Sequence, residues 1–177
     1  MENKLIVLYG FAASGKTTLA KLYIDEHPLA LAFEGDSIIG MMGQWRKYES
    51  EARRIIFEHT KSIIRNQLLA GKDVIIPYLL TEASDSESFE NIAHECGVEF
   101  IEVYIKFEKK EAVENLLRRG VWGEEGSPQL TKNDLPEIYK LYETMATAME
   151  KRDRVKIITS TLGDIEGAYK SLLTACS

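Results

Sequence analysis

Eight residues near the start of the chain, from Gly10 to Thr17, read Gly-Phe-Ala-Ala-Ser-Gly-Lys-Thr. Two glycines at this spacing let the backbone curl so that successive N–H groups point inward, where they can bind phosphate oxygens. Lys16 adds a mobile positive charge for the outer phosphates, and the Thr17 hydroxyl is a suitable ligand for Mg²⁺. The pattern is the phosphate-binding P-loop. We expect it to bind a nucleotide through Gly10, Ala12, Ala13, Ser14, Gly15, Lys16, Thr17 and Thr18.

The residues on either side of this loop predict the elements that it requires. An apolar run over 5–9 precedes the loop and predicts a buried strand, and an amphipathic stretch that begins at Leu19 predicts a helix. The loop would then lie at the N-terminus of a helix, whose dipole favours bound anions. The alternative is a glycine-containing turn whose lysine is solvated. The flanking strand and helix favour nucleotide phosphate binding.

Two acidic residues follow the second predicted strand. The apolar run over 29–33 ends at Glu34-Gly35-Asp36-Ser37. In an open α/β sheet the carboxyl ends of the strands line the ligand crevice, so both carboxylates should emerge beside the bound phosphates. There Asp36 can accept the proton of a substrate hydroxyl, and Thr17, Glu34 and Asp36 can hold Mg²⁺. Alternatively, Asp36 caps the helix that begins at Ser37.

The P-loop combined with Phe33-Glu34-Gly35-Asp36-Ser37 resembles the small-molecule kinases of the shikimate kinase, gluconate kinase and adenylylsulfate kinase group. Chloramphenicol phosphotransferase, whose acid after the second strand is implicated in accepting the hydroxyl proton, is similar here too. The resemblance extends in spacing over nearly the whole chain, and its specific parts are the P-loop and the acidic turn. It implies a three-layer P-loop fold, ATP and Mg²⁺ as cofactors, and Asp36 as the catalytic base beside Lys16.

The segment before a long predicted helix over 49–70 is the candidate site for the phosphate acceptor. Trp45 supplies an aromatic surface there and Arg46 a cation. In the related kinases an arginine near the start of this helix grips the acceptor, and Arg53 is placed to do so. We expect an acceptor pocket made of Asp36, Trp45, Arg46 and Arg53. Alternatively, Trp45 packs in the core and Arg46 is solvated.

The same helix carries a charged stripe that includes Arg54 and Glu58 at a spacing of one helical turn. Such pairs are common surface features, so Arg54 is expected to be a solvated partner of Glu58. Arg53 falls instead beside the apolar face with Phe57. A charge at that position needs a partner or a ligand, which favours Arg53 over Arg54 as a substrate contact.

A predicted helix over 108–120 ends in Arg118 and Arg119. The following segment contains glycines and prolines and resembles the lid of these kinases, whose arginines close over the phosphates and neutralise charge on the transferred group. We place the lid at about 118–136 and expect Arg118 and Arg119 jointly to act in catalysis. Alternatively, the helix dipole alone favours cations at this C-terminus.

The third predicted strand, over 73–80, departs from the pattern of many P-loop enzymes. Its end holds Pro77 and Tyr78, and no carboxylate follows before Glu82. Metal binding therefore depends on Thr17 and on the acids after the second strand. A water-activating ATPase or GTPase, which needs an acid at this strand end, is disfavoured.

Apolar strand-like runs alternate with helical patterns along the 177 residues, of which 45% are apolar. Strands are expected near 4–9, 29–33, 73–79, 99–107 and 154–159. Stretches long enough for crossover helices separate them, so we predict an α/β fold with a five-stranded, mostly parallel sheet and helices on both faces. The length suits one compact domain over 1–177 that includes the small lid.

The net charge of −6 and the dispersed Lys and Arg residues give no basic surface of the kind that binds nucleic acid. No apolar stretch at the N-terminus is long enough for a signal peptide or a membrane span, so we expect a cytoplasmic protein with no membrane partner. Cys96 and Cys176 share no metal-ligand spacing with the three histidines. The sequence gives no indication of oligomeric state.

These residues favour an ATP-dependent phosphotransferase that acts on a hydroxyl of a small molecule, with Asp36 as the base. Within the same chemistry, a nucleoside or nucleotide kinase is the alternative, because Trp45, Tyr48 and Arg53 could stack a base and hold a phosphate. An alternative of another class is a regulatory switch protein that binds ATP without transferring phosphate. The sequence does not name the acceptor.

Overall fold

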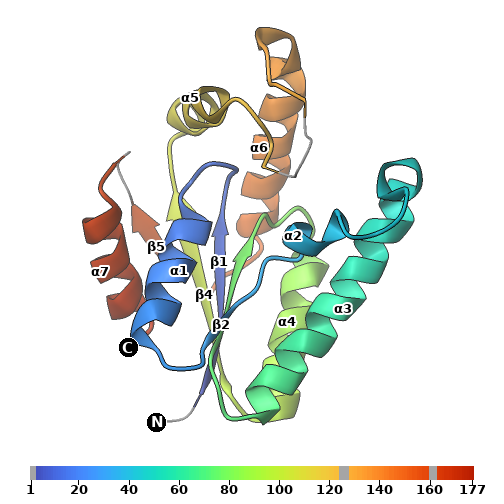
Figure 1. Ribbon diagram of the computed structural model, residues 1–177. Coiled ribbons are helices and arrows are strands. Elements are labelled where there is room, and N and C mark those ends of the chain that lie inside the picture. Colours follow the sequence, from blue (N-terminus) through green and yellow to red (C-terminus); the bar gives the residue numbers. More distant parts are fainter. Residues whose placement is uncertain (1–2, 124–127, 160–162) are drawn as a thin grey trace.

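The computed structural model describes residues 3–123, 128–159 and 163–177, in which five parallel strands form one sheet in the order β2–β3–β1–β4–β5 (Figure 1). The strands are β1 (Lys4–Gly10), β2 (Leu31–Ala32), β3 (Val74–Tyr78), β4 (Glu99–Lys106) and β5 (Lys156–Thr159). The predicted α/β fold with a five-stranded sheet is confirmed. Every pairing between neighbouring strands is parallel.

Helices cover both faces of this sheet. α1 (Lys16–Glu26) and α7 (Ile165–Ala175) pack on one face, and α3 (Glu49–Leu69) and α4 (Ala83–Cys96) pack on the other (Figure 1). The central strand β1 is therefore inaccessible to solvent from Leu5 to Tyr9. A parallel strand covered on both faces is apolar at successive positions rather than at alternate ones, which is why the run over 5–9 is uninterrupted.

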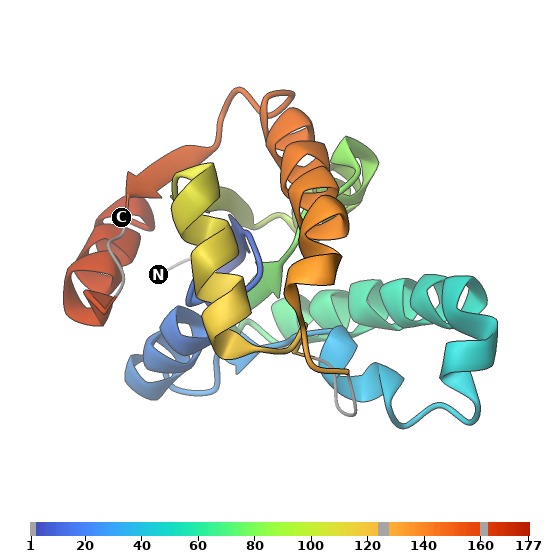
Figure 2. The ribbon, with the colours of Figure 1, turned by 90° about the horizontal axis from the view of Figure 1, so that it is seen from above.

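Two further helices stand over the carboxyl ends of the strands. α5 (Lys109–Arg119) and α6 (Leu135–Met149) lie above this edge of the sheet in both ribbon views (Figures 1 and 2). α2 (Asp36–Ile39) and two 3₁₀ helices, Trp45–Tyr48 and Lys132–Asp134, complete the described helices. None of the helices in the described ranges is both long enough and apolar enough to cross a membrane. The loops that follow the parallel strands thus emerge beneath α5 and α6.

β2 is shorter than predicted. The run over 29–33 predicted a buried strand, but β2 contains only Leu31 and Ala32, and both are half-buried. Leu29 is 74% exposed and has a left-handed backbone with φ of 66°. The physical reason is position, because β2 lies at the edge of the sheet and pairs only with β3. One further hydrogen bond, from Phe33 N–H to Ile75 O over 3.2 Å, keeps the chain directed toward Glu34.

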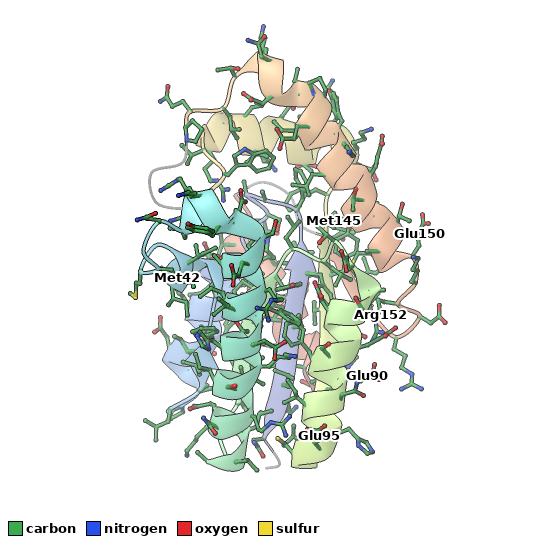
Figure 3. All side chains as sticks on the ribbon, turned by 90° about the vertical axis from the view of Figure 1, so that its right-hand side faces the viewer. Met42, Glu90, Glu95, Met145, Glu150 and Arg152 are labelled. Carbon is green, nitrogen blue, oxygen red and sulfur yellow. The ribbon has the colours of Figure 1, made fainter. Side chains whose placement is uncertain are left out.

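A cluster of charged and polar side chains, which we call the Arg152 cluster, ties the sheet to α4 and to the turn after α6; Tyr9, Ser86 and Glu102 in it are buried, and Glu90 and Arg152 are half-buried. Arg152 donates to the two carboxylate oxygens of Glu102 on β4, each over 2.9 Å. It also donates to Glu90 Oε2 on α4 over 2.8 Å (Figure 3). Ser86 Oγ on α4 donates to Glu102 Oε1 over 2.6 Å, and Tyr9 Oη on β1 donates to Ser86 Oγ over 2.6 Å. The cluster joins the strand that leads into the P-loop to the first turn of α4.

Candidate active site

The P-loop connects β1 to α1 and curls around the side chain of Lys16. Lys16 Nζ donates hydrogen bonds to the backbone oxygens of Gly10 and Phe11, both over 2.8 Å, and Lys16 is buried. α1 begins at Lys16, so the free N–H groups of its first turn face the loop. A cation and a helix N-terminus therefore meet at one point, which is an arrangement that binds phosphate.

Local backbone geometry explains the residue types in this loop. A Cβ at Gly10 would lie 2.6 Å from Ser14 Oγ, so a larger residue would clash where the loop closes on itself. Gly15, at the N-cap of α1, has φ of 87°, and Ala13 has φ of 63°. Left-handed residues within a short loop turn the N–H groups inward. The Ala13 conformation is uncommon for a residue with a side chain, and such strain concentrates at ligand-binding loops.

Thr17 and Glu34 lie together beside the P-loop. Thr17 Oγ1 is 3.3 Å from each carboxylate oxygen of Glu34. Among the residues that the structure describes, no group of three His, Cys, Asp or Glu side chains could hold a metal ion. Thr17 and Glu34 offer only oxygen ligands, and Mg²⁺ is commonly held by one or two protein oxygens that water and phosphate oxygens supplement.

Asp36 is the first residue of α2, directly after Glu34 and Gly35. Gly35 occupies the cap position of this helix, and Ser37 Oγ donates to Glu34 O over 2.6 Å. The side chain of Asp36 lies outside the described part of the structure. Its backbone lies between two residues that line the cleft described below, Gly35 and Ser37.

The arginines at the end of α5 face the same cleft, and both Arg118 and Arg119 line it. Arg119 Nε donates to Val121 O over 2.9 Å, and its guanidinium group also donates to Trp122 O. Burial lowers the pKa of Arg119, whereas the nearby Glu34 carboxylate raises that pKa. The charge of Arg119 therefore acts on the region where Thr17 and Glu34 meet.

Part of the predicted lid over 118–136 lies outside the described residues, namely 124–127. Within this segment Leu130 N–H donates to Gly120 O over 2.7 Å, which holds these two residues together. Trp122 lines the cleft and packs against the main core. A capping box formed by Thr131 and Asp134 then starts the 3₁₀ helix that leads into α6.

A cleft of about 1700 Å³ runs from the P-loop toward α3, α4 and α6. Most of the residues predicted for the site line it: Ala12, Ala13, Ser14, Gly15, Lys16, Thr17, Thr18, Glu34, Trp45, Arg53, Arg118 and Arg119. Gly10 and Arg46 are not among the described residues that line it. We call the part made by 12–18, Glu34 and α5 the P-loop end. The part made by Trp45, Tyr78, α3, α4 and α6 is the helical end.

Trp45 lies at the helical end and is also part of a small core. It is 8% exposed and packs with Ile39, Ala52 and Ile56. The guanidinium carbon of Arg46 lies 4.4 Å from the centroid of the Trp45 ring. Trp45 thus contributes an edge to the cleft while Arg46 covers part of its ring from outside.

The structure brings two of the three arginines of α3, Arg53 and Arg54, to the cleft. Arg53 Nε donates to Glu49 Oε1 over 3.0 Å, and both side chains line the helical end. The surface pair predicted between Arg54 and Glu58 is not observed among the described residues, where Glu58 pairs with Lys61 over 2.8 Å. Arg54 lines the cleft instead. The i,i+4 spacing permits a pair but does not choose between two nearby cations.

Asp85 is a cleft residue that the sequence analysis missed. It lies in the first turn of α4, and Tyr78 Oη at the end of β3 donates to Asp85 Oδ2 over 2.7 Å. Burial raises the pKa of Asp85, whereas the hydrogen bond from Tyr78 lowers it. A carboxylate therefore lies beside the end of β3, although it comes from the following helix and not from the strand itself. Asp85 could have been found from the sequence, because the helix that follows a central parallel strand starts at the ligand crevice.

α6 forms a wall of the helical end that the sequence analysis also missed. Glu137, Lys140, Leu141 and Thr144 line the cleft. Their spacing puts all four on one helix face. The spacing is visible in the sequence, but nothing in the sequence shows that this face looks into a cleft.

Three buried side-chain atoms have no hydrogen-bond partner in the described structure, namely Ser14 Oγ and both Nδ2 and Oδ1 of Asn115. Ser14 lies in the P-loop and Asn115 on α5, and both line the cleft. Buried polar groups are normally paired. Both side chains are therefore candidates for contact with a ligand, which would complete their hydrogen bonding.

A protein-family model described as an AAA domain matches residues 5–136. The match begins in β1 and ends at the start of α6, so it includes the P-loop, the acidic turn after β2 and the segment between α5 and α6. No curated protein sequence matches the chain.

Several solved structures share the fold. A gluconokinase from Sinorhizobium meliloti 1021 has a TM-score of 0.62 and 15% identity over 97% of this chain and 90% of that chain. The structure titled crystal structure of APE1195 has a TM-score of 0.59 and 19% identity, with 98% and 94% covered. A chain of the Pnkp1/Rnl/Hen1 RNA repair complex has a TM-score of 0.61 and 19% identity, over 86% of this chain but 47% of that chain. The fold is thus the α/β fold of P-loop kinases.

Proposed function

Because the chain belongs to the AAA domain family and has the fold of P-loop kinases, we propose that it transfers the γ-phosphoryl group of ATP to a hydroxyl group of a small molecule. The observation that carries this proposal is a cleft with two chemically different ends. Its volume of about 1700 Å³ exceeds the roughly 300–1,000 Å³ of pockets that hold one small ligand. The P-loop end suits the nucleotide and the helical end suits the acceptor.

At the P-loop end, Lys16 and Arg119 supply positive charge to the phosphates as negative charge spreads over the transferred group. The free N–H groups at the start of α1 bind phosphate oxygens. Mg²⁺ held with Thr17 and Glu34 would neutralise phosphate charge and orient the phosphates. Lys16 lies against Gly10 O and Phe11 O, so a short movement of its side chain brings its ammonium group to a phosphate.

In this proposal Asp36 is the base. The acceptor hydroxyl oxygen forms a bond to the γ-phosphorus, the bond from that phosphorus to the bridging oxygen of ADP breaks, and the hydroxyl proton passes to the Asp36 carboxylate. Support comes from position, because Asp36 follows Glu34 by two residues and begins a helix at the cleft wall. Glu34 is engaged with Thr17, which leaves Asp36 for the proton.

At the helical end, groups of both charges would hold the acceptor. Arg53 and Arg54 come from α3, Lys140 from α6 and Asp85 from α4. Guanidinium groups bind carboxylate or phosphate, and a carboxylate accepts hydrogen bonds from hydroxyl or amino groups. A small polar molecule with several hydrogen-bonding groups fits these walls.

A small acceptor is favoured over a nucleic acid. The net charge is −6, and at the helical end four acidic side chains, Glu49, Glu82, Asp85 and Glu137, outnumber the three cations Arg53, Arg54 and Lys140. Both features repel a phosphate backbone. The similarity to a chain of an RNA repair complex shows the fold and covers less than half of that chain.

Two alternatives remain as outcomes of the test. A nucleoside or nucleotide kinase would need an aromatic face for the base. Trp45, which was predicted for that role, is buried with Arg46 over its ring, whereas Tyr78 and Trp122 also line the cleft. A switch protein that binds ATP without transferring phosphate would not need a second polar end in its cleft.

The test is ADP release from Mg-ATP across sugar acids, shikimate-like alcohols, nucleosides, nucleotides, adenylylsulfate and hydroxyl-bearing antibiotics. We expect one acceptor class to raise turnover far above background. Asp36→Asn should then lower turnover by roughly 10²–10⁴-fold while ATP still binds.

Asp25→Asn, which removes an exposed carboxylate from α1, is the matched control and should keep full turnover. Turnover that survives in Asp36→Asn would exclude Asp36 as the base. Tight ATP binding with background ADP release on every acceptor would favour the switch protein.

A further inference from the structure

Asn115 is a buried amide whose hydrogen bonds are all missing. It is 5% exposed, and neither Nδ2 nor Oδ1 has a partner in the described structure. Its buried neighbours on α5 are Ala112, Val113 and Leu116, so an apolar residue would suit this helix face. An amide left unpaired there loses its hydration and gains nothing in return. Without a ligand, the residue is a net cost to the fold.

The position of Asn115 indicates which ligand completes its bonds. It lies one helical turn before Arg119 on α5, and residues at this spacing share a helix face. α5 passes above the loop between β1 and α1 in both ribbon views (Figures 1 and 2). The other unpaired side chain, Ser14, belongs to that loop. Asn115 therefore faces the P-loop end of the cleft rather than the walls made by α3 and α4.

The chemistry of an amide restricts the ligand further. Nδ2 donates two hydrogen bonds and Oδ1 accepts them. A phosphate oxygen can accept from Nδ2 but leaves Oδ1 unpaired. A hydroxyl group both donates and accepts, and an amino group beside a ring nitrogen offers the same pair. Both occur in the nucleoside part of ATP, in the ribose and in the base.

We propose that Asn115 binds the nucleoside part of the nucleotide whose phosphates the P-loop holds. This rests on the proposed nucleotide binding, but it does not depend on phosphoryl transfer. Asn115 is then a residue that distinguishes a nucleoside triphosphate from a bare triphosphate. In the ligand-free protein its unpaired amide lowers the stability of the fold, and bound nucleoside supplies the missing hydrogen bonds.

The test compares Asn115→Leu with the wild type by thermal unfolding, each ligand-free, with Mg-ATP and with Mg-tripolyphosphate. Leucine has the same number of side-chain heavy atoms and the same branching as asparagine, is somewhat larger, and cannot hydrogen-bond. Because leucine also favours helix more than asparagine does, Asn91→Leu, at an exposed position inside α4, is the matched control. ATP binding is read from the rise in unfolding temperature.

We expect ligand-free Asn115→Leu to unfold about 2–4 °C above the Asn91→Leu control. Its ATP-induced rise should shrink by an amount that corresponds to roughly tenfold weaker binding. The rise induced by tripolyphosphate should be the same in all three proteins. Stability and binding thus move in opposite directions, which a purely structural role for Asn115 would not produce.

Nucleotide analogues then identify the bonded group. The analogues are 2′-deoxy-ATP, 3′-deoxy-ATP and the triphosphate of purine riboside, which lacks the amino group. The analogue without the bonded group should bind the wild type about tenfold more weakly than ATP does, and should bind Asn115→Leu no worse than ATP does.

Other results overturn the proposal. A lower unfolding temperature for ligand-free Asn115→Leu would show that the amide stabilises the fold. Equal losses with ATP and with tripolyphosphate would assign it to the phosphates. If Asn115→Leu bound ATP as the wild type does, or if ATP did not stabilise the wild type, the proposed nucleoside contact would be contradicted. Turnover has no part in these readouts, so a failure of the proposed kinase activity is distinguishable from a failure of this proposal.

Discussion

The two ends of the cleft are built in different ways. The P-loop end is made mostly by consecutive residues, 12–18, whose shape follows from local backbone geometry such as the positive φ of Gly15 and Ala13. The helical end takes side chains from α3, α4 and α6 and from the end of β3, which are separated by tens of residues. One end depends on a short motif, and the other depends on how distant helices pack.

This difference shows which part of a kinase-like site a single sequence reveals. Phosphate is bound by backbone N–H groups, one lysine and one hydroxyl, so a contiguous motif suffices. An acceptor is bound by side chains whose positions depend on packing. At the helical end the Phe57 and Phe89 rings, with centroids 5.5 Å apart, set α3 against α4 and so bring Arg53 and Asp85 to one cleft.

The largest expected effect is at the P-loop end. Lys16→Ala removes the cation nearest the phosphates and should lower turnover by about 10³-fold, because a preorganised charge acts most strongly in a cleft shielded from water. Steady-state ADP release with the identified acceptor measures it. Lys21→Ala, which removes an exposed lysine from the same helix, should leave turnover unchanged. Equal losses in both variants would show that the effect is general to α1 rather than specific to the P-loop.

The next largest effect is on the stability of the polar cluster that contacts elements at both ends of the cleft. The Arg152 cluster reaches Tyr9, next to the P-loop, and Ser86, next to Asp85. Arg152→Ala leaves the buried Glu102 carboxylate without its cation and should lower the free energy of unfolding by about 3 kcal/mol. Urea denaturation measures this change. Arg154→Ala, which removes an 88% exposed side chain that pairs weakly with Glu90, should change stability by less than about 0.5 kcal/mol.

A smaller effect separates the two arginines at the end of α5. Arg119 interacts electrostatically with Glu34, so Arg119→Ala should lower kcat by about 10²-fold. Arg118→Ala should lower kcat by less than about tenfold. The comparison is made at saturating ATP and acceptor, so that changes in binding do not contribute. A larger loss in Arg118→Ala would reverse the assignment of the lid arginine.

The smallest effect tests the electrostatics of the helical end. Burial raises the pKa of Asp85 in the folded protein above its unfolded value, so the folded state holds this proton more tightly. The contribution of Asp85 to stability is therefore largest below the unfolded pKa, and it falls as pH rises through the folded pKa. The free energy of unfolding of the wild type minus that of Asp85→Asn should decrease across this window and then level off.

Tyr78→Phe tests how the hydrogen bond from Tyr78 contributes to the same pH dependence. The hydrogen bond from Tyr78 lowers the pKa of Asp85, so its removal should extend the decrease to higher pH. Urea denaturation at a series of pH values, with Asp85→Asn in both backgrounds, gives the two curves. A difference that increases with pH would mean that the carboxylate is stabilised rather than penalised by its surroundings.

Much of the fold could be predicted from the sequence. Buried parallel strands are uninterrupted apolar runs, so β1, β3 and β4 were identified close to their ends. The edge strand β2 was overestimated, because exposure at a sheet edge depends on the absence of a neighbouring strand. The prediction for the helices over 49–70 and 108–120 agrees with α3 and α5 within one residue at each end.

The residues of the candidate site could be predicted only where they belong to a short sequence motif or follow the end of a predicted strand. The Thr17–Glu34 pair followed from a motif and a strand end, and both residues are at the expected crevice. Asp85, Lys140 and Asn115 carry no motif. Arg54 was predicted to be an exposed partner of Glu58; it is exposed, but Lys61 pairs with Glu58 and Arg54 borders the cleft. Helical spacing shows which residues share a face, and it does not show what that face meets.

The sequence by itself determined the phosphate-binding loop, the acidic turn and the order of strands and helices, because each depends on residues that are neighbours in the chain. Tertiary structure alone decided which side chains complete the cleft, which acid lies beside the end of β3 and which buried amide is left unpaired. These depend on the packing of α3, α4, α5 and α6 around the carboxyl ends of the sheet. Contacts between residues far apart in sequence form only when the whole core is buried, so no local pattern encodes them.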